Sequence, residues 1–98
     1  MKQEQILEKY VMPNDKLISW REIDNETVFL HKEEKAFYEL NNTANLVWKK
    51  AVERRKVKEI IDAVGKKYKN VNKWVLKKDI VNFISDLLDK KIFLLGNE

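Results

Sequence analysis

Hydrophobic residues follow two different periods along this chain, and the period changes within residues 36–48, AFYELNNTANLVW. Residues 36–40 alternate with the period of two that is typical of a β-strand. Asn41 and Asn42 carry side chains that can cap a helix, and apolar residues from Ala44 onwards recur at helical spacing. The pattern therefore predicts strands before this segment and helices after it.

Three strands are predicted in the first half of the chain. Polar residues 24–26 and 32–34 separate them, and connections this short favour an antiparallel meander. Residues 1–15 are expected to form an N-terminal arm, in which residues 5–10 are either a helical turn or extended chain, and residues 16–98 form the domain. The predicted strands are residues 17–21, 27–31 and 35–40.

Three helices are predicted in the second half, because three strands cannot bury a face by themselves and need helices to cover it. The helices are expected at residues 43–54, 57–68 and 75–90, and the apolar residues 92–95 form either a last strand or a tail packed on the core. The predicted class is α+β. The side chains expected to face inward are Ala44, Val47, Trp48, Ala51, Ile60, Ile61, Val64, Tyr68, Leu76, Ile80, Phe83, Ile84 and Leu87.

Composition agrees with one small globular domain. The chain has 98 residues, of which 44% are hydrophobic, so it can build a single core. It has no cysteine, which excludes disulfides, thiolate metal sites and a cysteine nucleophile. No apolar stretch approaches the ~20 residues that span a bilayer, and the N-terminus does not read as a signal peptide. A cytoplasmic domain without membrane contact is expected.

Charge is divided unevenly between the two halves. Residues 1–48 hold 6 basic and 9 acidic side chains, a net of −3, whereas residues 49–98 hold 14 basic and 7 acidic, a net of +7. The second half could therefore meet an anionic partner, either a nucleic acid or an acidic peptide. The simpler interpretation is that lysines coat the solvent faces of the helices.

The residue types that catalysis needs are scarce. His31 is the single histidine, the carboxylates show no metal-ligand spacing, and the two glycines are too far apart for a phosphate-binding loop. We therefore expect no enzyme activity, no metal and no cofactor, which leaves binding as the class of function.

Two binding surfaces can be predicted. One is the free edge of the small sheet, which can accept an added peptide strand. The other is a second stripe on the third helix, about a quarter turn from its core stripe. The alternative is that this helix simply has a wide buried face. The second stripe consists of Lys77, Val81, Ser85, Leu88 and Ile92.

The chain resembles the PqqD-like family, whose members recognise leader peptides, because it has an ordered set of residues that matches the family's sequence pattern. The resemblance covers residues 16–95. It departs from the family pattern at residues 54–56 and at Lys91, where the family often has glycine. The matching residues are Tyr38, Leu40, Asn41, Thr43, Ala44, Val47, Trp48, Val57, Glu59, Ile60, Asp62, Ala63, Val64, Tyr68, Asp79, Ile80, Phe83, Leu87 and Ile92.

This resemblance implies a winged helix-turn-helix-like domain that binds the leader of a ribosomally synthesised, post-translationally modified peptide. The leader would add as an antiparallel strand beside the third strand and pack against the third helix, where Lys77 and Lys78 could attract its carboxylates. The domain would present the precursor to a modifying enzyme, such as a radical S-adenosylmethionine protein, or to a leader peptidase. The implied peptide-binding residues are Lys35, Ala36, Phe37, Tyr38, Glu39, Leu40, Lys77, Lys78, Val81, Ser85 and Leu88.

Two other functions stay open at this point. A nucleic-acid-binding winged helix would also combine three helices with a small sheet and a basic half. Against it, the third helix carries Asp79, Asp86 and Asp89, which would repel phosphates. The open strand edge could also pair with its own copy, so a monomer or a weak homodimer is expected.

Overall fold

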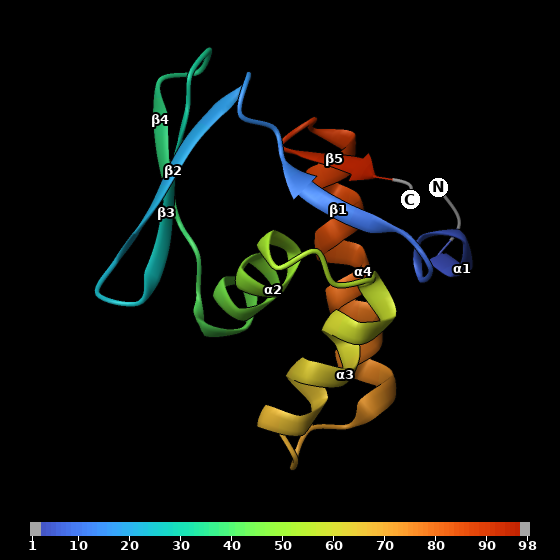
Figure 1. The fold of residues 1–98 in the computed structure, drawn as a ribbon. Helices are drawn as coiled ribbons and strands as arrows, with labels where there is room; N and C mark the ends of the chain where they lie inside the picture. The colour runs from blue at the N-terminus through green and yellow to red at the C-terminus, as the bar shows by residue number, and fades with distance from the viewer. Residues whose placement is uncertain (1–2, 97–98) are drawn as a thin grey trace.

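The computed structural model describes residues 3–96, and its elements surround one core (Figure 1). A three-stranded sheet lies beside α2, and a two-stranded sheet lies across one end of α4. No helix in these residues is long and apolar enough to cross a membrane. The elements are α1 (Gln3–Ile6), β1 (Tyr10–Pro13), β2 (Ile18–Ile23), β3 (Glu26–His31), β4 (Ala36–Glu39), α2 (Asn42–Val52), α3 (Val57–Lys67), α4 (Lys73–Asp89) and β5 (Phe93–Gly96).

The α+β class and the antiparallel meander are confirmed. Strands β2, β3 and β4 are neighbours in that order, with Ile18 opposite His31 in one pair and His31 opposite Ala36 in the other. The β2–β3 turn places Asp24 and Asn25 at φ of 51° and 67°, the left-handed pair that a two-residue hairpin loop requires. The polar residues at this position therefore set the register of the sheet.

The three long helices begin and end within two residues of their predicted bounds, and asparagine side chains cap α2 and α4. Asn41 accepts a hydrogen bond from the Ala44 N–H at 2.8 Å, and Asn72 accepts one from the Trp74 N–H at 2.9 Å. Each bond satisfies a backbone donor that the first turn of a helix leaves free. The Asn41 cap also fixes the direction in which the chain leaves β4, directly beside the site described below.

The predicted N-terminal arm is part of the domain core over its described residues. Strand β1 pairs with β5 in an antiparallel register that joins Tyr10 to Gly96 and Pro13 to Phe93. Ile6 and Val11 are both buried. The C-terminal residues 93–96 are thus a strand, which decides between the two alternatives left open by the sequence. Residues 1, 2, 97 and 98 lie outside the described part.

Trp48 on α2 is the residue through which the layers meet. Its side chain is fully buried, and its ring centroid lies 5.3 Å from Phe29 of the sheet and 4.9 Å from Phe93 of β5. A second link is polar: Asn45 of α2 accepts a hydrogen bond from the N–H of the buried Thr27 at 2.8 Å. These contacts hold the three-stranded sheet in a fixed position against the helices.

The second residue after helix α2, and likewise after helix α4, has a left-handed backbone conformation and is not glycine. Arg54 has φ of 63° and Lys91 has φ of 65°. After α4, the Ile92 N–H donates to the Leu87 carbonyl and the Lys91 N–H to the Leu88 carbonyl, the hydrogen-bond pattern that normally has glycine at this position. The two departures from the family's glycine pattern therefore fall where side chains are strained.

We expect Lys91→Gly to raise the free energy of unfolding by about 0.5–1 kcal/mol, because glycine adopts this backbone conformation without a Cβ clash. Urea denaturation followed by circular dichroism measures the change. Lys91→Ala is the matched control: it removes the same charge but keeps the clash, so it should bring no gain. Equal effects of the two substitutions would show that backbone strain is not the cause.

Candidate functional site: a groove between β4 and α4

Strand β4 has a free edge. The Leu40 N–H donates to the Thr27 carbonyl at 3.0 Å, and the antiparallel register then places the β3-directed groups at every second residue along β4. The N–H and C=O groups of Phe37 and Glu39 therefore point away from β3, and no hydrogen bond is recorded for them within residues 3–96. This edge can accept a further strand.

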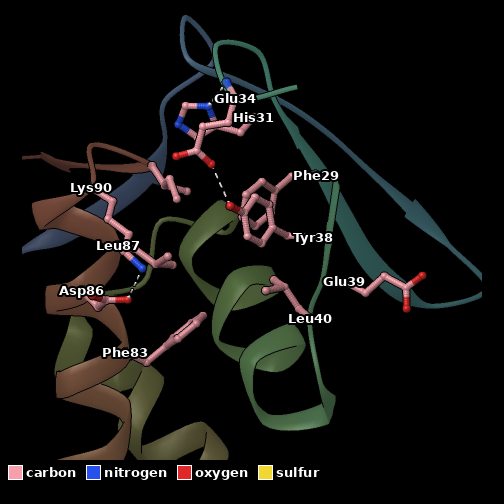
Figure 2. A pocket seen from close by; sticks show the side chains of 11 residues that line it. Phe29, His31, Glu34, Tyr38, Glu39, Leu40, Phe83, Asp86, Leu87 and Lys90 are labelled. Carbon is pink, nitrogen blue, oxygen red and sulfur yellow. Dashed lines mark hydrogen bonds and ion pairs between the residues drawn. The ribbon is translucent and has the colours of Figure 1, made fainter. Parts of the chain in front are cut away.

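A hollow of about 470 Å³ lies beside this edge, between β4 and the C-terminal half of α4 (Figure 2). Aromatic and aliphatic side chains form its inner surface, and charged side chains stand at its end near the β3–β4 turn. Both volume and composition are typical of a ligand site. The residues lining it are Phe29, His31, Glu34, Tyr38, Glu39, Leu40, Phe83, Asp86, Leu87, Lys90 and Ile92.

Polar side chains that line this hollow form hydrogen bonds and an ion pair with one another. The Tyr38 hydroxyl donates to Glu34 Oε1 at 2.8 Å, which raises the pKa of Tyr38. Lys90 Nζ lies 3.1 Å from Asp86 Oδ2, and this hydrogen bond raises the pKa of Lys90. Both shifts lie on the alkaline side, so at neutral pH Tyr38 is neutral and Lys90 is charged.

A second hollow of about 340 Å³ continues the groove past the end of β4. Phe83 lines both hollows and therefore stands between them. The second hollow is bounded by the start of α2, the α3–α4 connection and the N-terminal half of α4, and Asp79 is its one charged lining residue. The residues lining it are Asn41, Thr43, Ala44, Val47, Tyr68, Val71, Leu76, Asp79, Ile80 and Phe83.

The prediction that Val81 lines the groove is wrong. Val81 is 0% exposed and belongs to the hydrophobic core, and Leu88 is half-buried against the same core. At 100° per residue, the stripe from Lys77 to Leu88 lies on one flank of α4, and Asp79, Phe83 and Asp86 lie on the other. The groove is on this second flank.

The remaining helix residues expected to bind peptide are absent from the lining of both hollows. Lys77 Nζ lies 5.8 Å from the ring centroid of the exposed Trp74, Lys78 is exposed and Ser85 is half-buried. The family resemblance implied that Lys77 and Lys78 could attract the carboxylates of the peptide. The wall is instead acidic at Asp79 and Asp86, so the expected attraction of peptide carboxylates has no support in this geometry.

The strand residues have three different placements. Tyr38 and Leu40 line the first hollow, with Tyr38 stacked on Phe29 at 4.9 Å between centroids. Phe37 is 76% exposed on the opposite face of the sheet, and the Glu39 side chain points away from the hollow in Figure 2. Lys35, with φ of 55°, belongs to the turn before β4, and Ala36 begins the strand.

Only Tyr38, Glu39 and Leu40 of the residues lining the two hollows were predicted to bind peptide, and the lining residues that were missed include Glu34, Phe83, Asp86 and Lys90. Sequence reasoning placed Glu34 in a turn and Phe83 in the core. One signal was available, because Phe83 is a large apolar residue flanked on its helix face by Asp79 and Asp86. An apolar side chain surrounded by charges on one helix flank indicates a partly open site.

His31 has a structural role. It is buried, and its Nδ1 accepts a hydrogen bond from the Glu34 N–H at 3.1 Å, which shapes the turn that leads into β4. Within residues 3–96, no group of three or more His, Asp or Glu side chains could hold a metal ion. The chemistry of the groove is therefore that of apolar burial, hydrogen bonding and charge.

Two solved structures share this fold. "TbiB1 in Complex with the TbiA(beta) Leader Peptide" has a TM-score of 0.73 and 24% sequence identity. "Lasso peptide synthetase B1 complexed with the leader peptide" has a TM-score of 0.69 and 21% identity. Each likeness covers 89% of this chain and 98% of the other. No curated protein sequence matches the chain.

The family comparison supports a stronger conclusion than the structural likeness, because it compares the sequence itself. The model of "Coenzyme PQQ synthesis protein D (PqqD)" matches residues 26–92, from β3 to the end of the turn after α4. This range includes every residue that lines either hollow, and it covers more than half of the chain. The chain belongs to the PqqD family.

Proposed function

We propose that this protein is a peptide-binding domain that captures the leader of a ribosomally made precursor peptide. The leader lies in the groove as an additional strand, antiparallel to β4. The observation that carries the proposal is the free edge at Phe37 and Glu39 beside a hollow with an apolar inner surface. Main-chain hydrogen bonds supply the register, and apolar side chains that enter the hollow supply selectivity.

The related structures support this reading, since both titles name a leader peptide in the complex. In our proposal the domain carries out no reaction itself. It holds the precursor while a separate enzyme, such as a radical S-adenosylmethionine protein or a leader peptidase, acts on another part of the peptide. This assignment of binding to the domain and of the reaction to a separate enzyme fits a site that offers burial, hydrogen bonds and charge.

Nucleic acid fits the groove poorly. Asp79 and Asp86 stand on the flank of α4 that faces the groove, and carboxylates there repel phosphates. Lys77 and Lys78 are on the same helix but outside both hollows. Duplex DNA is therefore a suitable negative control in the binding experiments.

The function can be tested without knowing the natural precursor. A displayed library of random 15-residue peptides is selected on the immobilised domain, and an enriched peptide is titrated into the isotope-labelled domain. We expect binding with a Kd of roughly micromolar or below, with the largest amide shifts at Phe37, Glu39 and Phe83. Absence of any enriched peptide would contradict the proposal, and tight binding of duplex DNA would then favour the nucleic-acid alternative.

Strand addition makes a sharper prediction at Phe37, whose N–H points away from β3. We expect Phe37→Pro to weaken the selected peptide at least tenfold, because proline removes that donor. The fold should survive, since an edge strand tolerates proline where the N–H faces outward. Isothermal titration calorimetry measures the affinity, and circular dichroism checks the fold.

Phe37→Ala is the matched control for this experiment. It removes the exposed ring but keeps the N–H, so the affinity should change less than threefold. If alanine weakens binding as much as proline does, the peptide contacts the ring on the outer face of the sheet instead of the edge of β4.

A further inference from the structure

The second hollow combines an apolar lining with a single carboxylate. Tyr68, Val71 and Phe83 contribute to its apolar surface, and Asp79 stands at its border on the groove flank of α4. A purely aliphatic ligand group would leave this carboxylate without a partner. A side chain with an apolar stem and a cationic head would match both parts.

Asp79 has no ion pair among the described residues. Two lysines near the start of α4 are engaged elsewhere: Lys73 Nζ donates to the Gly65 carbonyl at 2.7 Å, and Lys77 Nζ lies over the Trp74 ring. Lys78 is exposed and lines neither hollow. Asp86, about two helical turns further along α4, is already bonded to Lys90. Asp79, which is exposed, is therefore the carboxylate lining the second hollow, and no ion pair within residues 3–96 occupies it.

We propose that the second hollow is a subsite for a lysine or arginine of the leader peptide, with Asp79 as its counter-ion. This inference rests on the proposed function and specifies the ligand's chemistry. The stem of the basic side chain packs on Phe83 and Val71, and its charged head reaches Asp79. The subsite makes the domain select a basic residue in addition to the apolar side chain that enters the first hollow.

The direction of the chain adds a constraint. Strand β4 runs toward Asn41, which lines the second hollow, so an antiparallel leader passes the second hollow before it pairs with β4. The basic residue therefore precedes the paired segment in the peptide.

The peptide selection described above tests the subsite when it is run in parallel on three forms of the domain. These are the unmodified chain, Asp79→Asn, and Asp89→Asn as the matched control. Asp89 is exposed on the same helix and lines neither hollow. We expect the unmodified chain and Asp89→Asn to enrich lysine or arginine on the N-terminal side of an apolar residue, and Asp79→Asn to lose this preference while still enriching the apolar residue.

The affinity of one enriched peptide then measures the interaction between its basic residue and Asp79. Replacing its basic residue with glutamine should weaken binding about fivefold to the unmodified chain and less than twofold to Asp79→Asn, as expected for a partly exposed ion pair. Peptides that enrich without a basic residue, or with one only on the C-terminal side, overturn the subsite and leave the proposed function intact. No enrichment by any form overturns the proposed function, and the subsite with it.

Discussion

Trp48→Ala is expected to lower the free energy of unfolding by about 3–5 kcal/mol, the range for truncating a buried aromatic residue. The ring is fully buried between the sheet and β5, so its removal leaves a cavity where Phe29, Phe93 and Trp20 now meet it. A domain of this size has a stability of about 5–15 kcal/mol, so the variant should be marginal. Urea denaturation followed by circular dichroism measures the loss.

Trp74→Ala is the matched control. Its ring is 79% exposed, so the same substitution should change the stability by about 0.5 kcal/mol or less. Trp48→Phe adds a second comparison, because the Trp48 Nε1 is buried and has no hydrogen-bond partner among residues 3–96. Phenylalanine removes this unsatisfied donor, and the gain offsets part of the lost packing. If Trp48→Ala and Trp74→Ala cost the same, Trp48 does not organise the core.

Val81→Asp is the second large effect, with an expected loss of about 3–5 kcal/mol, because it puts an unpaired charge into the core. Thermal unfolding compared with the unmodified chain measures it. The substitution also distinguishes the buried flank of α4 from the groove flank. A charge on the groove flank would leave the fold largely intact, whereas a charge at Val81 should unfold most of the molecules.

Asn82→Asp controls for the new charge, since it lies one residue further along α4 and is exposed. Its stability should stay within about 0.5 kcal/mol of the unmodified chain. A folded Val81→Asp domain that has lost peptide binding would contradict the observed burial and return Val81 to the groove.

Local periodicity predicted most of the architecture, for a physical reason. The meander and the three long helices are each specified by side-chain spacing and by polar residues at their ends, such as Asn41 and Asn72. Pairing of β1 with β5 could not be predicted in this way. Each strand has only four residues, and the paired residues are 80 or more positions apart along the chain.

The groove flank of α4 was beyond sequence reasoning for a related reason. A helical wheel shows which residues share a flank, but not which flank meets the sheet. Both flanks of α4 carry apolar residues, Val81 and Leu88 on one and Phe83 on the other. The core cluster that includes Ile6 and Phe93 buries Val81, and these residues come from the two ends of the chain.

The aromatic contacts beneath the groove have a consequence for how a ligand is discriminated. Tyr38 stacks on Phe29, Phe29 on Trp48, and Trp48 packs on Phe93, so one column of rings joins the groove to the far side of the domain. A floor anchored in this way is preorganised and has little entropy left to lose on binding. In the proposed function, a mismatched peptide must therefore adapt its own conformation to this floor, and the conformational entropy that the peptide loses sets the penalty on its affinity.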